Sequence, residues 1–141
     1  MSGRFFLDTN IFVYAFDTSA PLKAAKCEEL IGAALTSQMG FVSYQVVQEF
    51  FNVALRRFNP PIAMAEAERF LNEIFIPLVA VHSSSALVME ALHLRAEYRL
   101  SWYDSLIVCA AMQARCETLF TEDLQNGQRF GDLMIVNPFL N

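Results

Sequence analysis

Short apolar runs alternate with longer segments of helical periodicity along most of this chain. The short runs have the length of buried strands, and in the longer segments apolar residues recur every three or four positions. This alternation predicts an α/β protein with a mainly parallel sheet, because helices usually connect parallel strands. The pattern predicts about five strands, at residues 4–7, 40–43, 78–81, 118–121 and 133–136.

Helix caps and breaks divide the remaining segments. Ser43, the serines at 83–85 and Ser101 each precede a helical segment that their hydroxyls can cap. A helix must end before Asn59, because a residue that precedes proline disfavours the helical conformation. The expected helices lie at residues 11–16, 22–35, 44–58 and 62–75, from the serine cluster to about 98, and at 102–115, with a turn at 126–127.

Two acidic residues stand directly after predicted strands. Asp8 follows the apolar run that ends the first strand, and Asp123 lies just beyond the strand at 118–121. In an open α/β sheet, ligands bind in the crevice beyond the carboxyl ends of the strands. We therefore expect both carboxylates to lie at the same edge of the sheet.

Two further acids lie on predicted helices near that edge. Asp104 is in the first turn of its helix and shares a face with Ile107 and Val108. Glu49 has Val46, Phe50 and Val53 at helical spacing, so apolar side chains partly surround it. Taken singly, each of the four acids is better explained by a structural role, as a cap, a turn former or a solvent-facing residue. Together they favour a functional site.

Carboxylates in one crevice repel and raise one another's pKa values unless a cation neutralises them. Hard oxygen ligands without His or Cys favour Mg²⁺ or Mn²⁺ over Zn²⁺. Such an ion lowers the pKa of a bound water and screens a phosphate, so the expected chemistry is phosphodiester hydrolysis. We expect direct or water-mediated coordination by Asp8, Asp104 and Asp123. Glu49 is expected to bind metal or to orient the attacking water, with Asn10 and Thr121 supporting these ligands from outside.

Composition sets limits on this interpretation. The 141 residues show no repeat, low-complexity segment or linker, so residues 1–141 are expected to form one domain. The formal net charge of −5 and the pI of about 4.9 argue against a broad phosphate-binding face. Any contact with nucleic acid must then be local. The basic residues available for it are Lys23, Lys26, Arg56, Arg57, Arg95, Arg99 and Arg115.

The chain is apolar for a globular domain. Hydrophobic residues make up 55% and the mean hydropathy is +0.32, so a homodimer or another bound partner is expected. No run approaches the roughly 20 apolar residues of a membrane span, and the first residues lack a signal-peptide pattern, which predicts a cytoplasmic protein. Most of the 13 Phe and all three Cys (Cys27, Cys109 and Cys116) are expected in the core. Neither His82 nor His93 belongs to a motif.

Two other enzyme classes fit less well. A phosphotransferase with an Asp nucleophile also carries that Asp after the first strand, but it has a second Asp two residues on. Asn10 occupies that position here. A dinucleotide-binding enzyme is disfavoured because no GxGxxG follows the first strand.

Four segments of the chain resemble the PIN domain, particularly that of VapC-type toxins: FFLDTNIFVYAF, SYQVVQEFFNVA, WYDSLIVCAAMQARC and LFTEDLQNGQRF. The resemblance covers essentially the whole chain, and the segments match the acidic motifs of the family in order and spacing. Glu122 is an additional acid, which we expect to face solvent. The positions that match the motifs are Asp8, Glu49, Asp104 and Asp123, with Thr121 at the hydroxyl position beside the last acid.

The resemblance implies a three-layer α/β/α sandwich, a Mg²⁺ or Mn²⁺ site and RNA as the substrate. It further implies a homodimeric toxin that inhibits translation by cleaving tRNA, rRNA or mRNA. Its partner would be a VapB-type antitoxin whose C-terminal segment occupies the groove and the active site. Two alternatives stay open: a PIN-type nuclease that processes RNA outside a toxin pair, and a non-catalytic interaction module whose acids hold a structural ion. A small antitoxin-like reading frame upstream would favour the toxin.

Overall fold

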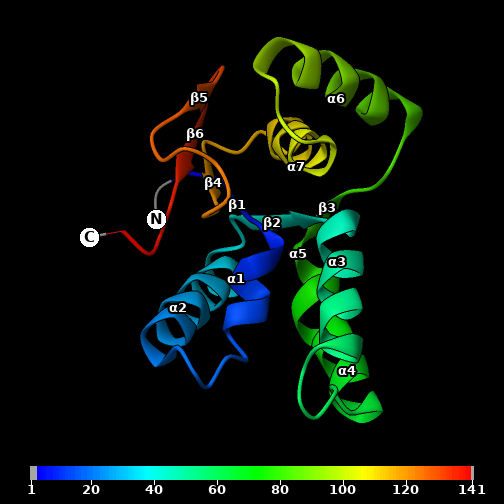
Figure 1. Cartoon of the computed structure of the whole chain (residues 1–141), viewed down its shortest axis with the longest axis vertical. Coiled ribbons are helices and arrows are strands. Elements are labelled where there is room, and N and C mark those ends of the chain that lie inside the picture. The colour runs from blue at the N-terminus through cyan, green and yellow to red at the C-terminus, as the bar shows by residue number, and fades with distance from the viewer. Residues whose placement is uncertain (1–2, 141) are drawn as a thin grey trace.

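A twisted sheet forms the middle layer of the structure, a computed structural model that describes residues 3–140 (Figure 1). Within these residues the sheet has six strands in the order β3-β2-β1-β4-β6-β5. All neighbouring strands run parallel except β5, which is antiparallel to β6. The strands are β1 (Phe5–Leu7), β2 (Gly40–Ser43), β3 (Val79–Val81), β4 (Thr118–Phe120), β5 (Arg129–Phe130) and β6 (Leu133–Val136).

Helices cover both faces of this sheet. Figure 1 shows α7 against one face with α6 stacked on its outer side, and the first five helices on the other face. The predicted three-layer α/β/α sandwich with a mainly parallel sheet is therefore confirmed. The helices are α1 (Thr9–Tyr14), α2 (Pro21–Ser37), α3 (Tyr44–Arg56), α4 (Met64–Phe70), α5 (Ile76–Leu78), α6 (Ser85–Tyr98) and α7 (Trp102–Gln113), with a π-helical turn η1 (Leu71–Phe75) between α4 and α5.

The chain reverses its direction of travel across the sheet next to β1. From β1 it passes to β2 and β3 on one side, and it then returns through α6 and α7 to β4 on the other side. Leu7 pairs with Phe120, and the Asp8 amide donates to the Phe120 carbonyl at 3.2 Å. The carboxyl ends of β1 and β4 are thus level, at the place where α/β sheets bind ligands.

Aromatic side chains fill much of the core. All 13 Phe of the sequence are buried or pack against the buried cluster, as the apolar runs predicted. Phe50 of α3 is the centre of one group: its ring stacks on Phe70 with centroids 5.1 Å apart and meets Phe75 edge-on at 5.2 Å. These contacts attach α3 to the helices that follow it.

Three local features differ from the predictions. β5 was not expected, because a strand of only two residues carries no periodicity. The helix expected at residues 62–75 begins at Met64 and widens into η1. Ser43 occupies the N-cap position of α3, but its side chain makes no capping hydrogen bond, whereas Ser84 and Ser101 do cap α6 and α7.

The three cysteines are free and buried, as expected. Burial raises the pKa of Cys27 to about 12, of Cys109 to about 11 and of Cys116 to about 12. Their thiols stay protonated and unreactive at neutral pH. None of the helices in residues 3–140 is long and apolar enough to cross a membrane.

Candidate active site

The four acids singled out in the sequence line one cavity of about 240 Å³. Each comes from a different element: the end of β1, the middle of α3, the first turn of α7 and the loop after β4. The cavity opens at the carboxyl end of the sheet beside β1 and β4. Its lining residues are Asp8, Thr9, Asn10, Glu49, Asn52, Val53, Tyr103, Asp104, Ile107 and Asp123.

Asp8 is the most buried of these acids, with 6% of its surface exposed. Its Oδ1 accepts the Thr9 amide at 2.7 Å, and its Oδ2 accepts the Thr121 hydroxyl at 2.8 Å. The first contact caps α1, so the structural role considered for Asp8 is real. Burial raises the pKa of Asp8 to about 7, although the bonds from Thr121 and Thr9 lower it; the charges on Asp123 and Glu49 raise it further.

Thr9 connects the first acid to the second, and the sequence analysis missed it. Its hydroxyl donates to Glu49 Oε1 at 2.6 Å, which joins α1 to α3 across the cavity wall. Thr9 is buried at 8% exposure, whereas Glu49 is half-buried. The available signal was a hydroxyl directly after a strand-end Asp, in the first turn of a helix.

Asp123 is held by the two residues predicted to support the acids. Its amide donates to Thr121 Oγ1 at 3.1 Å, and Asn10 Nδ2 lies 3.5 Å from Asp123 Oδ2. Partial burial raises the pKa of Asp123, and the charges on Asp104, Glu122 and Glu49 raise it further. Thr121 therefore links Asp8 and Asp123 by donating to one and accepting from the other.

Asp104 lies in the first turn of α7, where its amide donates to Ser101 Oγ at 3.2 Å. The backbone of Asp104 thus belongs to an ordinary helix cap. Its half-buried carboxylate lines the cavity and adds to the charge that raises the pKa of Asp123. Asp104 therefore fits both interpretations, as part of a helix cap through its backbone and as a candidate ligand through its carboxylate.

The donor set suits a hard divalent cation. The acids supply only oxygen ligands. Burial raises the pKa values of Asp8 and Asp123, and neighbouring carboxylates raise them further; a bound cation would offset both effects. Within residues 3–140, no three Asp, Glu, His or Cys side chains share one coordination sphere. A bound ion would then have one or two carboxylate ligands and complete its shell with water, which is common for Mg²⁺.

Glu122 does not simply face solvent, so that expectation was wrong. Its side chain is 21% exposed, accepts the Tyr14 hydroxyl and pairs with Lys23 Nζ at 3.2 Å. The Lys23 ammonium also lies over the rings of Tyr14 and Phe139, at 4.6 and 4.9 Å from their centroids. Glu122 therefore fastens the loop after β4 to α1 and α2, and it is not among the residues that line the acidic cavity.

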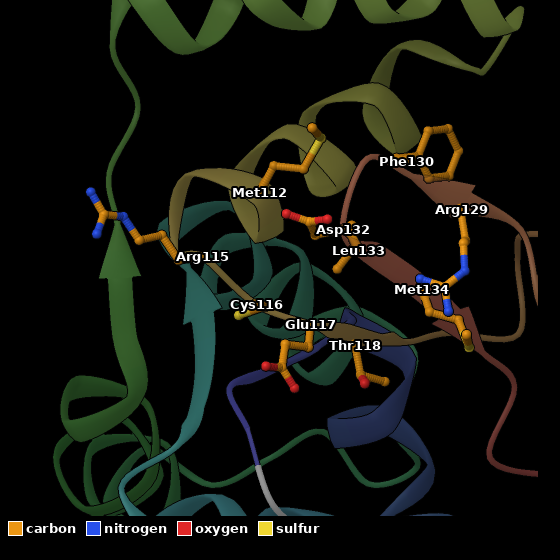
Figure 2. Close-up of a pocket in the computed structure, with 10 residues that line it drawn as sticks. All are labelled: Met112, Arg115, Cys116, Glu117, Thr118, Arg129, Phe130, Asp132, Leu133 and Met134. Atoms are coloured by element: carbon orange, nitrogen blue, oxygen red, sulfur yellow. The ribbon is translucent and has the colours of Figure 1, made fainter.

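A larger cavity of about 790 Å³ lies at the opposite end of the sheet, where β4 and β6 begin (Figure 2). Arg115 lines it together with Glu117, Arg129 and Asp132. Arg115 was counted among the cations available to flank the acids, and its position at the other end of the sheet rules that out.

Comparison with known proteins agrees with this architecture. A chain from a toxin–antitoxin complex of Klebsiella pneumoniae superposes with a TM-score of 0.67 at 18% identity, covering 95% of this chain and 97% of that one. VapBC2 from Rickettsia felis, bound to a DNA fragment from its promoter, gives 0.58 at 19%, covering 93% and 96%. At these identities the similarity establishes the fold alone. A search of curated proteins gave no match.

The sequence itself matches a family model. The model describes the PIN domain and matches residues 5–128, a range that includes all four acids of the cavity and the whole of β1 to α7. The match covers most of the chain, and the fold agrees with it. The chain therefore belongs to the PIN domain family.

Proposed function

We propose that this protein is a divalent-metal-dependent endoribonuclease and the toxin of a toxin–antitoxin pair. PIN domains are generally nucleases, and this chain belongs to that family. The observation that carries the proposal is the cavity in which Asp8, Glu49, Asp104 and Asp123 lie together at the carboxyl end of the sheet. Neighbouring carboxylates that repel one another, of which Asp8 is buried, destabilise a fold, which favours a role in function over a role in structure.

The hydrogen bonds around the cavity support the role that we propose for each residue. Thr121 and the Thr9 amide hold both oxygens of Asp8, so this carboxylate is a fixed anchor for Mg²⁺ or Mn²⁺. Asp104 and Asp123 are the other ligands we propose, directly or through water. Thr9 holds Glu49 Oε1, which leaves Oε2 to accept a hydrogen bond from the attacking water and orient it.

A divalent ion, when bound, supplies a water of lowered pKa and screens the charge that grows on the phosphate. The acids on their own would repel a polyanionic substrate, since the chain already carries a net charge of −5. Asn10 and Asp123 both line the cavity, and the Asn10 amide donates to Asp123 Oδ2 at 3.5 Å, which restrains that carboxylate. The chain thus contributes fixed ligands and an oriented water.

The toxin assignment and the partners rest on the neighbours of the fold. Both structures named above are toxin–antitoxin assemblies, which supports a VapB-type antitoxin as the partner and the cytoplasm as the site of action. The exposed apolar side chains of α6 support a homodimer, because Val88, Met89 and Leu92 are 38–58% exposed on one helix. RNA is proposed as the substrate from the resemblance to VapC-type toxins.

The proposal is tested by incubating purified protein, free of any antitoxin, with total cellular RNA in Mg²⁺, in Mn²⁺ or in EDTA. We expect cleavage only with metal, and its loss in Asp8→Asn and Asp104→Asn. Asp132→Asn is the matched control, since it neutralises an exposed acid at the opposite end of the sheet. Cleavage that persists in Asp8→Asn would contradict the site.

The same assay separates the alternatives. A folded wild-type protein that cleaves no RNA would favour the non-catalytic interaction module. Cleavage combined with normal growth of cells that express the protein alone would favour an RNA-processing nuclease outside a toxin pair. Growth arrest that requires Asp8 and is relieved by a co-expressed upstream reading frame is the outcome the toxin assignment predicts.

A further inference from the structure

A second, smaller pocket of about 220 Å³ adjoins the acidic cavity, between the start of α3 and the start of α7. Aromatic rings form much of its wall: Tyr44, His82, Trp102 and Tyr103. The rings of Tyr44 and His82 are tilted by 31° with centroids 5.4 Å apart. Among the described residues, those lining this pocket include no Asp, Glu, Lys or Arg. We call this space the aromatic pocket.

A buried hydroxyl in the wall of the aromatic pocket lacks a partner. Ser43 is 3% exposed, and its Oγ is the buried side-chain oxygen or nitrogen that has no hydrogen bond in residues 3–140. It stands at the N-cap position of α3 without capping the helix. A buried hydroxyl without a hydrogen bond is costly, so this group fits a ligand that supplies one.

The aromatic pocket lies beside the acidic cavity. Tyr103 lines both spaces and precedes Asp104 in the first turn of α7. Gln45 Nε2 donates to the Tyr103 carbonyl at 3.4 Å, which ties the start of α3 to the start of α7. A ligand that places a phosphate at the acids can therefore reach the aromatic pocket with its neighbouring part.

We infer that the aromatic pocket binds one nucleobase of the RNA substrate, next to the scissile phosphate. This inference rests on the proposed nuclease function. Single-stranded RNA is recognised by stacking unpaired bases on aromatic rings and by hydrogen-bonding their edges. Tyr44 and His82 supply ring faces, and Ser43, Gln45 and Gln48 supply uncharged donors and acceptors.

Size and charge favour a base over other occupants. The volume equals that of roughly seven water molecules, enough for one ring system, whereas a helix is about 10 Å across. An uncharged lining offers no counterion to a phosphate and no carboxylate to a metal ion. The alternative occupant is a second copy of this chain, because Val88 of exposed α6 also reaches the pocket rim.

The test combines a protein variant with a substrate variant. Tyr44→Ala removes a ring that is 43% exposed, and Tyr98→Ala is the control, with a ring 39% exposed that packs on Phe130 away from both spaces. The substrates are short single-stranded RNAs, intact or with one abasic nucleotide on either side of the scissile phosphate. We expect Tyr44→Ala to lower kcat/KM on intact RNA by roughly 5- to 150-fold, the loss of one base–aromatic stack, and Tyr98→Ala to leave it unchanged.

The effects of Tyr44→Ala and of the abasic nucleotide on kcat/KM should also not multiply when the two are combined. If the missing base is the one that rests on Tyr44, the abasic RNA is cut equally slowly by wild type and by Tyr44→Ala. Multiplicative losses at both abasic positions would overturn the inference while leaving the nuclease intact. A lower oligomeric mass of Tyr44→Ala in light scattering, with equal losses on all RNAs, would assign the face to a second copy and overturn it too. A wild type that cuts no RNA in Mg²⁺ or Mn²⁺ would remove the proposed function and the inference together.

Ser43→Ala gives an independent readout. Replacing a Ser that caps a helix destabilises the protein and lowers its melting temperature by a few degrees. Because Ser43 Oγ makes no such bond and a buried unpaired hydroxyl is costly, we expect a melting temperature that is unchanged or higher, and a weaker preference among RNAs that differ only at the base bound by the pocket. A lower melting temperature with unchanged base preference would make Ser43 a structural cap and contradict its part in the pocket.

Discussion

Asp8→Asn is expected to inactivate the protein and to make it more stable at the same time. Wild-type Asp8 is buried and its pKa is raised from 3.8 to about 7, so the folded state binds this proton more tightly than the unfolded state does. The stabilising contribution of the protonated carboxyl is complete below pH 3.8 and is lost as the pH rises towards 7. Asn cannot ionise, so the variant does not lose this stability as the pH rises.

The size of the effect follows from that pKa and from the hydrogen bonds. At about 1.36 kcal/mol per pH unit, raising the pKa from 3.8 to about 7 corresponds to roughly 4 kcal/mol at pH 8. The Asn oxygen can still accept the Thr9 amide, but its amide nitrogen cannot accept the Thr121 hydroxyl, which costs about 1–2 kcal/mol. We expect a net gain of about 2 kcal/mol in the free energy of unfolding at pH 8.

Urea unfolding in EDTA, followed by circular dichroism from pH 4 to pH 8, measures this directly. The variant should be about 1–2 kcal/mol less stable than wild type at pH 4 and more stable at pH 8, with the two curves crossing in between. Mg²⁺ at 100 times its dissociation constant should add about 2.7 kcal/mol to wild type and less to Asp8→Asn. Asp132→Asn, which removes an exposed acid, should follow wild type throughout.

A difference in stability that does not change with pH would refute this reasoning, because the whole effect is assigned to ionisation of one buried carboxyl. The same conclusion would follow if Asp8→Asn were less stable than wild type at pH 8 in EDTA. Equal stabilisation of both proteins by Mg²⁺ would show that the ion binds elsewhere.

Thr9→Val keeps the shape of the side chain but removes the hydrogen bond to Glu49. We expect it to lower the RNA cleavage rate by about 10- to 100-fold without unfolding the protein. An unchanged rate would show that Glu49 does not need this bond and would contradict the role proposed for it. Phe50→Ala should cost about 3–5 kcal/mol in urea unfolding, whereas Leu55→Ala, 54% exposed on the same helix, should stay within about 0.5 kcal/mol. Equal losses would mean that α3 packs differently. Ser84→Ala removes a hydroxyl that caps α6 and should cost about 1 kcal/mol; no measurable loss would argue against that cap.

The position of the acids in the fold was predictable because it depends on strand ends. The apolar run Phe5-Phe6-Leu7 predicted a buried strand and thus Asp8 at its carboxyl end, and the same holds for Asp123 after β4. The order β3-β2-β1-β4 then brings those two ends together, which the parallel α/β pattern implied. Long helices that begin after a capping Ser, such as α6 and α7, could also be predicted from the sequence.

Other features depend on contacts that no local pattern records. β5 has two residues and exists through its pairing with β6. Glu122 was expected in solvent because its partners, Tyr14 and Lys23, lie about a hundred residues away in sequence. Ser43 has the sequence context of a helix cap, yet its hydroxyl makes no capping bond, and only the placement of the starts of α3 and α7 reveals the space beside it. Long-range packing thus decided each point that the sequence left open.

The central claim is that the acidic cavity hydrolyses RNA with a metal-activated water. The most direct test is a single-turnover cleavage of one end-labelled RNA by wild type in Mg²⁺ and in EDTA, with the product ends identified by mass spectrometry. We predict cleavage only in Mg²⁺, giving a linear terminal phosphate and no 2′,3′-cyclic phosphate, because water rather than the ribose 2′-hydroxyl attacks. Cleavage in EDTA, or a cyclic phosphate product that Asp8→Asn forms at the wild-type rate, would contradict the account.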